Sequence, residues 1–390
     1  MKSIDKNVVM LGWVSFFTDM ASAMINPILP IFVVLILHEG MDKLGFIVAI
    51  ATFVSYALRL LSGYLSDRYG IVKPLVVGGY ALSALSKPLM GTAHGYQGIA
   101  ALKAFERVGK GLRSAPKDLM ISAYSKTNAS GKTFGFHKTM DIAGELSGTL
   151  ILFALLWYFG QSETVIRNIF YATLIPGLAG LTVVALFVRD IEPKRNQPAI
   201  RFGFSARDKA AVKSLFFYFV FIFFLFNDAF FTMQAKNIGI ATTLIPLLFV
   251  VSTAMQTLTS YPLGLLIDRY GVDRVLFFSY LSGITAQLLL LLQKPLFTWI
   301  AYAFLGLFTV ASLNANRACI SQSADNRGSV YGVFYAGVAL FAGAGAFVSG
   351  MIWEYFGMQS TLLYALLGTI SMLLLFLAVK IIQKLDRGDR

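Results

Sequence analysis

Gly63-Tyr64-Leu65-Ser66-Asp67-Arg68-Tyr69-Gly70 has a counterpart in Gly264-Leu265-Leu266-Ile267-Asp268-Arg269-Tyr270-Gly271, whose first glycine lies 201 residues further along. The two stretches share the pattern Gly-x-x-x-Asp-Arg-x-Gly, and their offset is about half of the 390-residue chain. A fainter pair, Phe17-Thr18-Asp19 and Phe226-Asn227-Asp228, repeats at a similar offset. We therefore expect the chain to consist of two related halves.

Long apolar stretches fill most of the sequence around these motifs. Apolar residues make up 57% of the chain and charged residues 14%, with a mean hydropathy of +0.69, whereas soluble chains contain about 45–50% and about 25%. A membrane-spanning helix needs roughly 20 apolar residues. The stretches that reach this length are approximately 8–37, 43–66, 73–94, 96–122, 132–160, 166–188, 213–236, 241–266, 274–293, 296–320, 329–353 and 359–382. They are continuous rather than alternating, which excludes transmembrane strands.

This pattern predicts an all-α polytopic membrane protein with 12 transmembrane helices in two pseudo-symmetric six-helix bundles. Residues 1–189 would form the first bundle and residues 213–390 the second. The only long polar stretch, 190–212, would be a cytoplasmic linker between them. Two bundles related as parallel repeats are typical of transporters that alternate access to a central site.

The basic residues of the connections indicate the orientation. One set of span ends carries most of the Lys and Arg, while the opposite set carries only Lys43, Arg167, Lys236 and Lys294. Because cytoplasmic loops are enriched in Lys and Arg, we expect a multi-pass protein of the inner (cytoplasmic) membrane with both termini in the cytoplasm. The net charge of +13 then mostly reflects topology, and no nucleic-acid partner is expected.

The doubled Gly-x-x-x-Asp-Arg-x-Gly pattern resembles the signature loop of the major facilitator superfamily, and the resemblance covers nearly the whole chain. It implies a gating loop between the second and third span of each half, formed by Gly63, Asp67 and Arg68 and by Gly264, Asp268 and Arg269. In this interpretation Asp67 and Asp268 cap helix ends or pair with arginine as a cytoplasmic latch. The alternative is a polar turn that only sets topology.

The first half is also similar to a subgroup of bacterial permeases of unsettled substrate. The similarity rests on Ser15-Phe16-Phe17-Thr18-Asp19, on Lys87-Pro88, on Arg107-Val108-Gly109-Lys110-Gly111-Leu112-Arg113 and on Phe134-Gly135-Phe136-His137-Lys138. Two positions depart from the expected pattern. Ala23 stands where an acidic residue is expected, and the fifth span lacks the Gly-Pro step of the antiporter signature, which weakens an inference of antiport.

The fourth predicted span carries charges along one face. A charge near the bilayer centre costs at least about 2.5–3.5 kcal/mol, so it should face a cavity or another charge. At about 100° per residue, the following side chains share an arc of roughly 120°: Lys103, Glu106, Arg107, Lys110, Arg113 and Lys117. This basic face favours an anionic substrate bound by Arg107, Lys110 and Arg113, since a guanidinium matches carboxylate or phosphate. The alternative is a structural cluster in which Glu106 pairs with a lysine.

The fifth predicted span places His137, Asp141 and Glu145 on one face. Two carboxyl groups one turn apart in a medium of low dielectric constant do not both ionise at low cost, so one should bind a proton readily. Histidine titrates near neutral pH and can relay a proton. We therefore predict proton coupling through these three residues together with Asp19. The alternative is a set of ion pairs with the basic fourth span.

Asp19 and Asp228 are predicted in the middle of the first spans of the two halves, and the span that carries Asp19 should bend at Pro27 and Pro30. Asp228 and Asn316 are further candidates for substrate binding, although an asparagine in a span more often bonds a neighbouring helix.

The expected activity is secondary active transport of a small organic solute, anionic or carboxylate-bearing, by proton-coupled alternating access. The rival is proton-driven export of cationic or amphipathic drugs. The chain shows no phosphate-binding Gly-rich loop, no nucleophile–base motif and a single cysteine, Cys319, so no enzyme activity, cofactor or metal is expected. The expected partners are the solute, protons and lipid, and the protein is expected to be a monomer.

Overall fold

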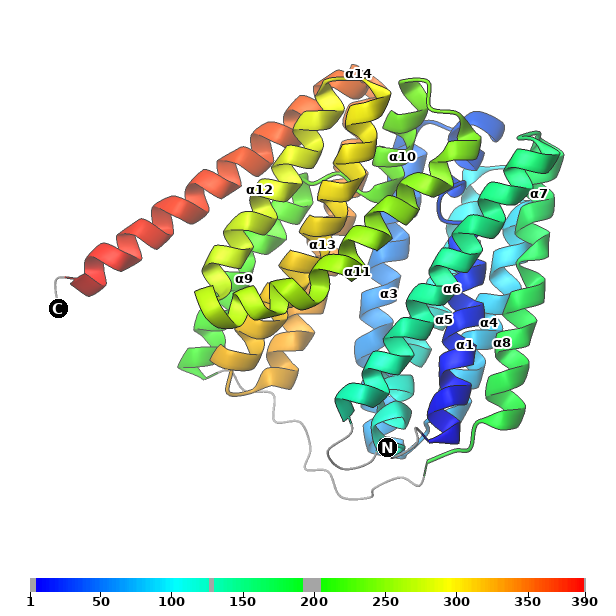
Figure 1. Ribbon diagram of the computed structural model, residues 1–390, viewed down its shortest axis with the longest axis horizontal. Coiled ribbons are helices and arrows are strands. Elements are labelled where there is room, and N and C mark those ends of the chain that lie inside the picture. Colours follow the sequence, from blue (N-terminus) through cyan, green and yellow to red (C-terminus); the bar gives the residue numbers. More distant parts are fainter. Residues whose placement is uncertain (1–4, 126–129, 192–204, 389–390) are drawn as a thin grey trace. The chain divides into compact units, whose positions relative to one another are not determined.

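The structure is a computed structural model that describes residues 5–125, 130–191 and 205–388 (Figure 1). The described residues form helices joined by short connections, without strands. The chain divides into two compact units, one of Met1–Ala199 with Ala241–Leu247 and one of Ile200–Ile240 with Leu248–Arg390. The all-α class predicted from the sequence is confirmed.

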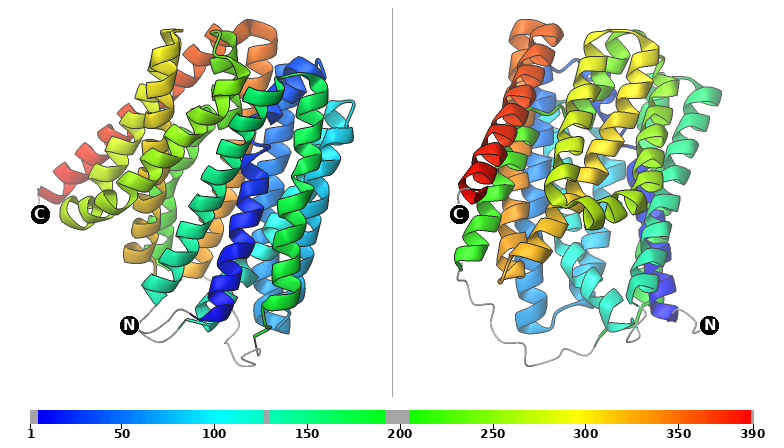
Figure 2. Two further views of the ribbon diagram at one scale, coloured as in Figure 1. Left: turned by 45° about the vertical axis from the view of Figure 1, so that its right-hand side comes forward. Right: turned by 60° about the vertical axis from the view of Figure 1, so that its left-hand side comes forward.

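The first unit contains the helices of the first predicted bundle. They are α1 (Lys6–Ala23), α2 (Leu29–Ile31), the π-helical turn η1 (Phe32–Ile36), α3 (Met41–Tyr69), α4 (Lys73–Leu89), the 3₁₀ turn η2 (Met90–Thr92), α5 (Tyr96–Ala123), α6 (Ser130–Phe159), α7 (Glu163–Ala172) and α8 (Leu174–Phe187). Helix α1 packs against α6 on one side and α8 on another, and α5 packs against both α3 and α4 (Figure 2).

The second unit contains the remaining long helices. They are α9 (Ala206–Phe224), α10 (Asp228–Asn237), α11 (Ile245–Tyr270), α12 (Val272–Leu291), α13 (Pro295–Ser323) and α14 (Arg327–Gly388). The 3₁₀ turn η3 (Thr242–Leu244) and the first residues of α11 belong to the first unit. Helix α14 is two helices joined at Gly357, which has a φ of 81°. Figure 1 shows that the two parts of α14 run in opposite directions. Aromatic rings pack in the core of this unit. The rings of Phe221 and Tyr280, for example, stack with their centroids 4.5 Å apart.

Each of the predicted spans coincides with one of these helices, with two or three consecutive elements, or with one of the two parts of α14. Eight segments of the described residues are long and apolar enough to cross a membrane by length and composition alone. One of them, Ser329–Ile382, holds two of the predicted spans. Helix α5 is not among the eight because charged residues line it, and α1 and α4 are not among them either.

The first span of each half is interrupted. Helix α1 ends at Ala23, and the chain passes through turns around Pro27 before α2 begins, which confirms the predicted bend. In the second unit α9 ends at Phe224 and α10 begins at Asp228. Asp228 lies within the candidate span Ala206–Asn237, as predicted, but it is the first residue of the second helix of that span. The Asn227 side chain accepts a hydrogen bond from Ala229 N at 3.0 Å and starts a new helix.

The two Gly-x-x-x-Asp-Arg-x-Gly motifs are helix ends and not loops, which corrects the sequence interpretation. Residues 63–69 are the last turns of α3, and residues 264–270 are the last turns of α11. The glycine that closes each motif ends the helix, because Gly70 (φ 65°) and Gly271 (φ 85°) adopt a conformation that favours glycine. The surroundings of Gly63 and the side chains of Asp67 and Arg68 lie outside the described part. Asp268 and Arg269 are exposed, and Gly264 is half-buried.

Helix α9 begins at Ala206, within the stretch predicted as linker, because Ser205 and Asp208 form a capping box. Residues 192–204 of that stretch lie outside the described residues. The buried Asp208 carboxylate also accepts hydrogen bonds from Asp325 N at 2.9 Å and from Asn326 N at 3.0 Å. It thereby ties the start of α9 to the start of α14.

Candidate functional site

The charged face of α5 packs against α4 at two glycines. A Cβ atom added at Gly79 would lie 2.5 Å from the carbonyl oxygen of Gly109, so the two backbones touch and only glycine fits. Arg113 lies directly against Gly79, because a Cβ atom added there would also lie 2.9 Å from the Cβ atom of Arg113.

Arg113 is buried and held by α4. Its guanidinium donates to Ser83 Oγ at 2.5 Å and to Gly79 O at 3.4 Å, and it lies over the Tyr80 ring at 4.4 Å. A cation–π contact and hydrogen bonds of this kind satisfy the charge within the protein. Of the three residues predicted to bind substrate on this face, Arg113 therefore has a structural environment.

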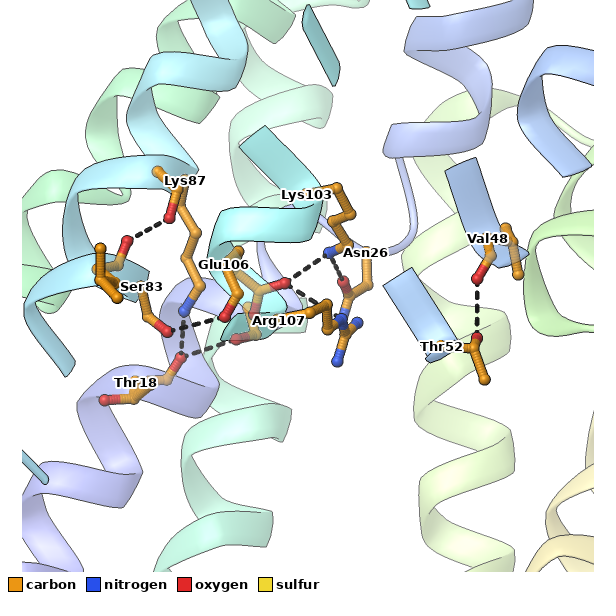
Figure 3. A network of polar contacts seen from close by, with 12 residues as sticks. Thr18, Asn26, Val48, Thr52, Ser83, Lys87, Lys103, Glu106 and Arg107 are labelled. Carbon is orange, nitrogen blue, oxygen red and sulfur yellow. Dashed lines mark hydrogen bonds and ion pairs between the residues drawn. The ribbon is translucent and has the colours of Figure 1, made fainter. Parts of the chain in front are cut away.

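Glu106 is the acidic centre of the face (Figure 3). The residue is 2% exposed, and its carboxylate lies 3.2 Å from Lys103 Nζ and 3.2 Å from Arg107 Nε. Lys103 also donates to Asn26 Oδ1, beyond the end of α1, at 3.2 Å. These contacts match the structural alternative raised for Glu106 and Lys103.

Lys87 is a member of this cluster that the sequence did not single out as a site residue. It is 2% exposed and donates to the backbone oxygen of Thr18 on α1 at 3.1 Å (Figure 3). It also interacts electrostatically with Glu106. The signal in the sequence was a lysine within an apolar span, but its partner lies 69 residues away and no spacing rule identifies it.

Arg107 and Lys110 keep donors without a partner. In the described part of the chain, the two Nη atoms of Arg107 and the Nζ of Lys110 make no hydrogen bond or ion pair, and both side chains are half-buried. The cluster of Lys87, Lys103, Arg107, Lys110 and Arg113 thus surrounds one contacting carboxylate, that of Glu106. Its surplus of positive charge is what an anionic ligand would neutralise.

A second polar chain links α5, α1 and α6. Lys117 Nζ lies 3.2 Å from Ser15 Oγ, which lies 2.9 Å from His137 Nε2, and His137 Nδ1 lies 3.5 Å from Asp141 Oδ1. Ser15 and His137 are buried. Lysine only donates hydrogen bonds, so Ser15 Oγ accepts from Lys117. The Asp141 carboxylate accepts from a proton on Nδ1, which leaves the Ser15 proton to be donated to Nε2. A neutral His137 then carries its proton on Nδ1, facing Asp141.

This direction of hydrogen bonding predicts an uncommon tautomer. In ¹⁵N NMR spectra above neutral pH, His137 should show a protonated Nδ1 and an unprotonated Nε2. Only three histidines are present, so the spectrum of His137→Gln assigns the signals. Ser15→Ala should release the preference and Ser15→Thr, which keeps the hydroxyl, should preserve it. A protonated Nε2 in the unaltered protein would contradict the prediction.

The other predicted proton-coupling residues lie near this chain. Asp19 is half-buried on α1 and has no hydrogen bond or ion pair within the described residues, but it interacts electrostatically with Lys87, Lys110 and Lys117. Glu145 lies one turn beyond Asp141 on α6 and is also half-buried. The structure brings together His137 and Asp141.

The second unit contains two of the predicted substrate-binding residues, Asp228 and Asn316. Asp228 is exposed as the first residue of α10. Asn316 is 1% exposed, and its Nδ2 donates to Ser312 O on its own helix at 2.8 Å. Asn316 therefore uses a donor within α13, while the charged groups concentrate in the first unit.

Long apolar helices with charged side chains gathered inside them are features of a polytopic membrane transporter. A family model for the Major Facilitator Superfamily matches residues 11–235 and 215–388, and the chain belongs to this superfamily. It is a transporter and not an enzyme.

Similar proteins support this assignment. An uncharacterized MFS-type transporter of Methanocaldococcus jannaschii is 29% identical over 96% of this chain and 95% of its own length. An uncharacterized protein of Mycobacterium tuberculosis is 26% identical over 82% of this chain and 80% of its own. Among solved structures, the nucleoside transporter NupG superimposes with a TM-score of 0.80 at 14% identity, covering 95% of this chain and 99% of that one. A bacterial homologue of the human lysosomal transporter Spinster gives a TM-score of 0.71 at 15% identity, covering 96% and 94%. At such identities the structures show the shared fold alone.

Proposed function

We propose that this protein carries a small organic solute, anionic or carboxylate-bearing, across the cytoplasmic membrane by proton-coupled alternating access. Both termini lie in the cytoplasm, and the protein works as a monomer. The observation that carries the proposal is the surplus of cations on α5, where Arg107 and Lys110 have donors without partners. Unpaired charges inside a membrane protein are costly and mark substrate or ion pathways.

Proton coupling is assigned to His137, Asp141, Glu145 and Asp19. The support is the hydrogen-bonded chain from Lys117 through Ser15 to His137, which ends at Asp141. Such a chain connects an acid on α6 to the helix that carries the substrate-binding cations. A proton that arrives at Asp141 or His137 changes the charge that α5 experiences, which is how loading with a proton and binding of an anion become linked.

The motif residues Asp67 and Asp268 retain their proposed role as latches on the cytoplasmic side. Each lies in the last turn of a long helix that a positive-φ glycine closes. Asp228 and Asn316 remain proposed contributors from the second unit.

Export of cationic or amphipathic drugs is the second candidate function. One observation favours it, namely that the Asp19 carboxylate has no hydrogen bond or ion pair within the described residues. The surrounding cations weigh against it, because Lys87, Lys110 and Lys117 would repel a cation that approaches this carboxylate.

A binding screen followed by a transport assay tests the proposal. Purified protein would be heated with monocarboxylates, dicarboxylates, sugar phosphates and quaternary ammonium drugs, since a ligand stabilises the state that it binds. We expect stabilisation by acids. Uptake of the best acid into proteoliposomes should rise with an inward proton gradient, and Arg107→Gln or Lys110→Gln should lower its affinity about 10–100-fold, the value of a hydrogen bond to a charged group.

Lys294→Gln provides the matched control, because Lys294 is an exposed lysine at the start of α13 without a partner in the described residues. It should transport as the unaltered protein does. Equal affinity for the acid in the control and in both α5 variants would refute the anion site. Stabilisation by the drugs alone would favour the exporter.

A further inference from the structure

The polar groups around α5 separate into those with protein partners and those without. Lys103 and the Nε of Arg107 contact Glu106, Lys87 contacts Thr18, and Arg113 contacts Ser83. Among the described residues of this cluster, the groups left over are the two Nη atoms of Arg107, the Nζ of Lys110 and the carboxylate of Asp19. They come from two helices, α5 and α1, which Figure 3 shows side by side near Thr18 and Arg107.

Asp19 and Lys110 attract each other electrostatically but do not form an ion pair. No nitrogen–oxygen distance between them falls within the 4.0 Å of an ion pair. A ligand that carries both an acidic and a basic group can contact both of these opposite charges. The carboxylate would hold a donor, and the lysine together with the arginine fork would hold an acid.

A ligand with a single charge fits this arrangement poorly. An anion that lies against Arg107 and Lys110 approaches the Asp19 carboxylate, and like charges at short range in a medium of low dielectric constant repel strongly. A cation that lies against Asp19 approaches Lys87 and Lys110. A molecule with an acidic group at one end and an ammonium group at the other satisfies all the leftover groups at once.

We propose that the substrate is a zwitterion, with a carboxylate or phosphonate bound by Arg107 and Lys110 and an ammonium group bound by Asp19. This proposal rests on the proposed function and narrows its substrate class. It gives Asp19 a role that combines with proton coupling, because one carboxylate binds either the ammonium group or a proton.

Matched pairs of compounds test the inference. γ-Aminobutyrate is compared with butyrate, β-alanine with propionate, and 2-aminoethylphosphonate with ethylphosphonate, and butylamine represents the ammonium group alone. Binding to purified protein is measured by calorimetry. We expect at least one amino compound to bind about tenfold or more tightly than its partner without the amine and than butylamine.

Variants assign the two ends of the ligand. Asp19→Asn should reduce the affinity ratio of the amino compound to its plain acid to about one, while Asp19→Glu, which keeps the carboxylate, should preserve a preference. Arg107→Gln should weaken both members of a pair. Asp42→Asn, which alters a carboxylate paired with Lys43 on α3, is the control and should change neither value.

The outcomes separate this inference from the proposed function. Plain acids that bind as tightly as the amino acids, with no effect of Asp19→Asn, would overturn the zwitterion and leave the anion carrier standing. Butylamine as the tightest ligand, lost in Asp19→Asn, would overturn both. If Arg107→Gln left the affinity for every acid and amino acid unchanged, the anion site itself would be overturned.

Discussion

Replacing Glu106 with glutamine should lower the free energy of unfolding of the detergent-solubilised protein by about 3–5 kcal/mol. The residue is 2% exposed, and its carboxylate lies 3.2 Å from both Lys103 Nζ and Arg107 Nε. The amide keeps the shape of the side chain but removes the one negative charge in contact with these cations. The buried lysines and arginines then repel each other without compensation. Unfolding by SDS or heat, followed by tryptophan fluorescence, measures the loss.

Two further variants identify the cause. Glu163→Gln makes the same chemical change in an ion pair with Arg167, where the glutamate side chain is 56% exposed, and it should cost about 0–1 kcal/mol. Lys103→Met combined with Glu106→Gln removes a cation along with the acid and should recover part of the stability. A loss in Glu106→Gln no larger than in Glu163→Gln would mean that water or ions screen the cluster.

The fold was readable from the sequence because a membrane imposes simple rules on length and polarity. Apolar stretches of about 20 residues located the helices. The repeat of Gly63–Gly70 at Gly264–Gly271 indicated two related halves. Local backbone chemistry was harder to read. The same glycine-rich motifs looked like loops, since Gly, Ser and Asp are common in turns, but in the structure only Gly70 and Gly271 leave the helix.

The site was readable only as far as one helix determines it. A helical wheel places Lys103, Arg107 and Arg113 on one face of α5, yet an arc of roughly 120° is wide enough to meet more than one neighbour. Arg113 therefore lies against α4, whereas Arg107 keeps free donors. The contacts of Lys87 with Thr18 and of Ser15 with His137 join residues 69 and 122 positions apart. They follow from how helices pack, which no spacing within a span reveals.

The packing of α6 against α1 gives the second large expected effect. Gly144 and Gly148 lie one turn apart on α6, and a Cβ added to either would overlap the backbone of α1, at Phe16 and at Met20. A small residue every fourth position lets helix backbones approach closely. Gly144→Ala and Gly148→Ala should each lower the free energy of unfolding by about 1–3 kcal/mol, and the double variant should lower it by more than either.

The same variants should also disturb the polar chain, because the distance between α1 and α6 sets the 2.9 Å contact between Ser15 Oγ and His137 Nε2. Pushing the helices apart should release the Nδ1-protonated tautomer of His137 in the NMR spectrum, as Ser15→Ala does. Gly135→Ala is the control on the same helix, since nothing lies within 4 Å of an added Cβ there. It should leave both stability and tautomer unchanged or slightly favour the helix. If the double variant kept the tautomer at reduced stability, the hydrogen bond would not depend on this glycine contact.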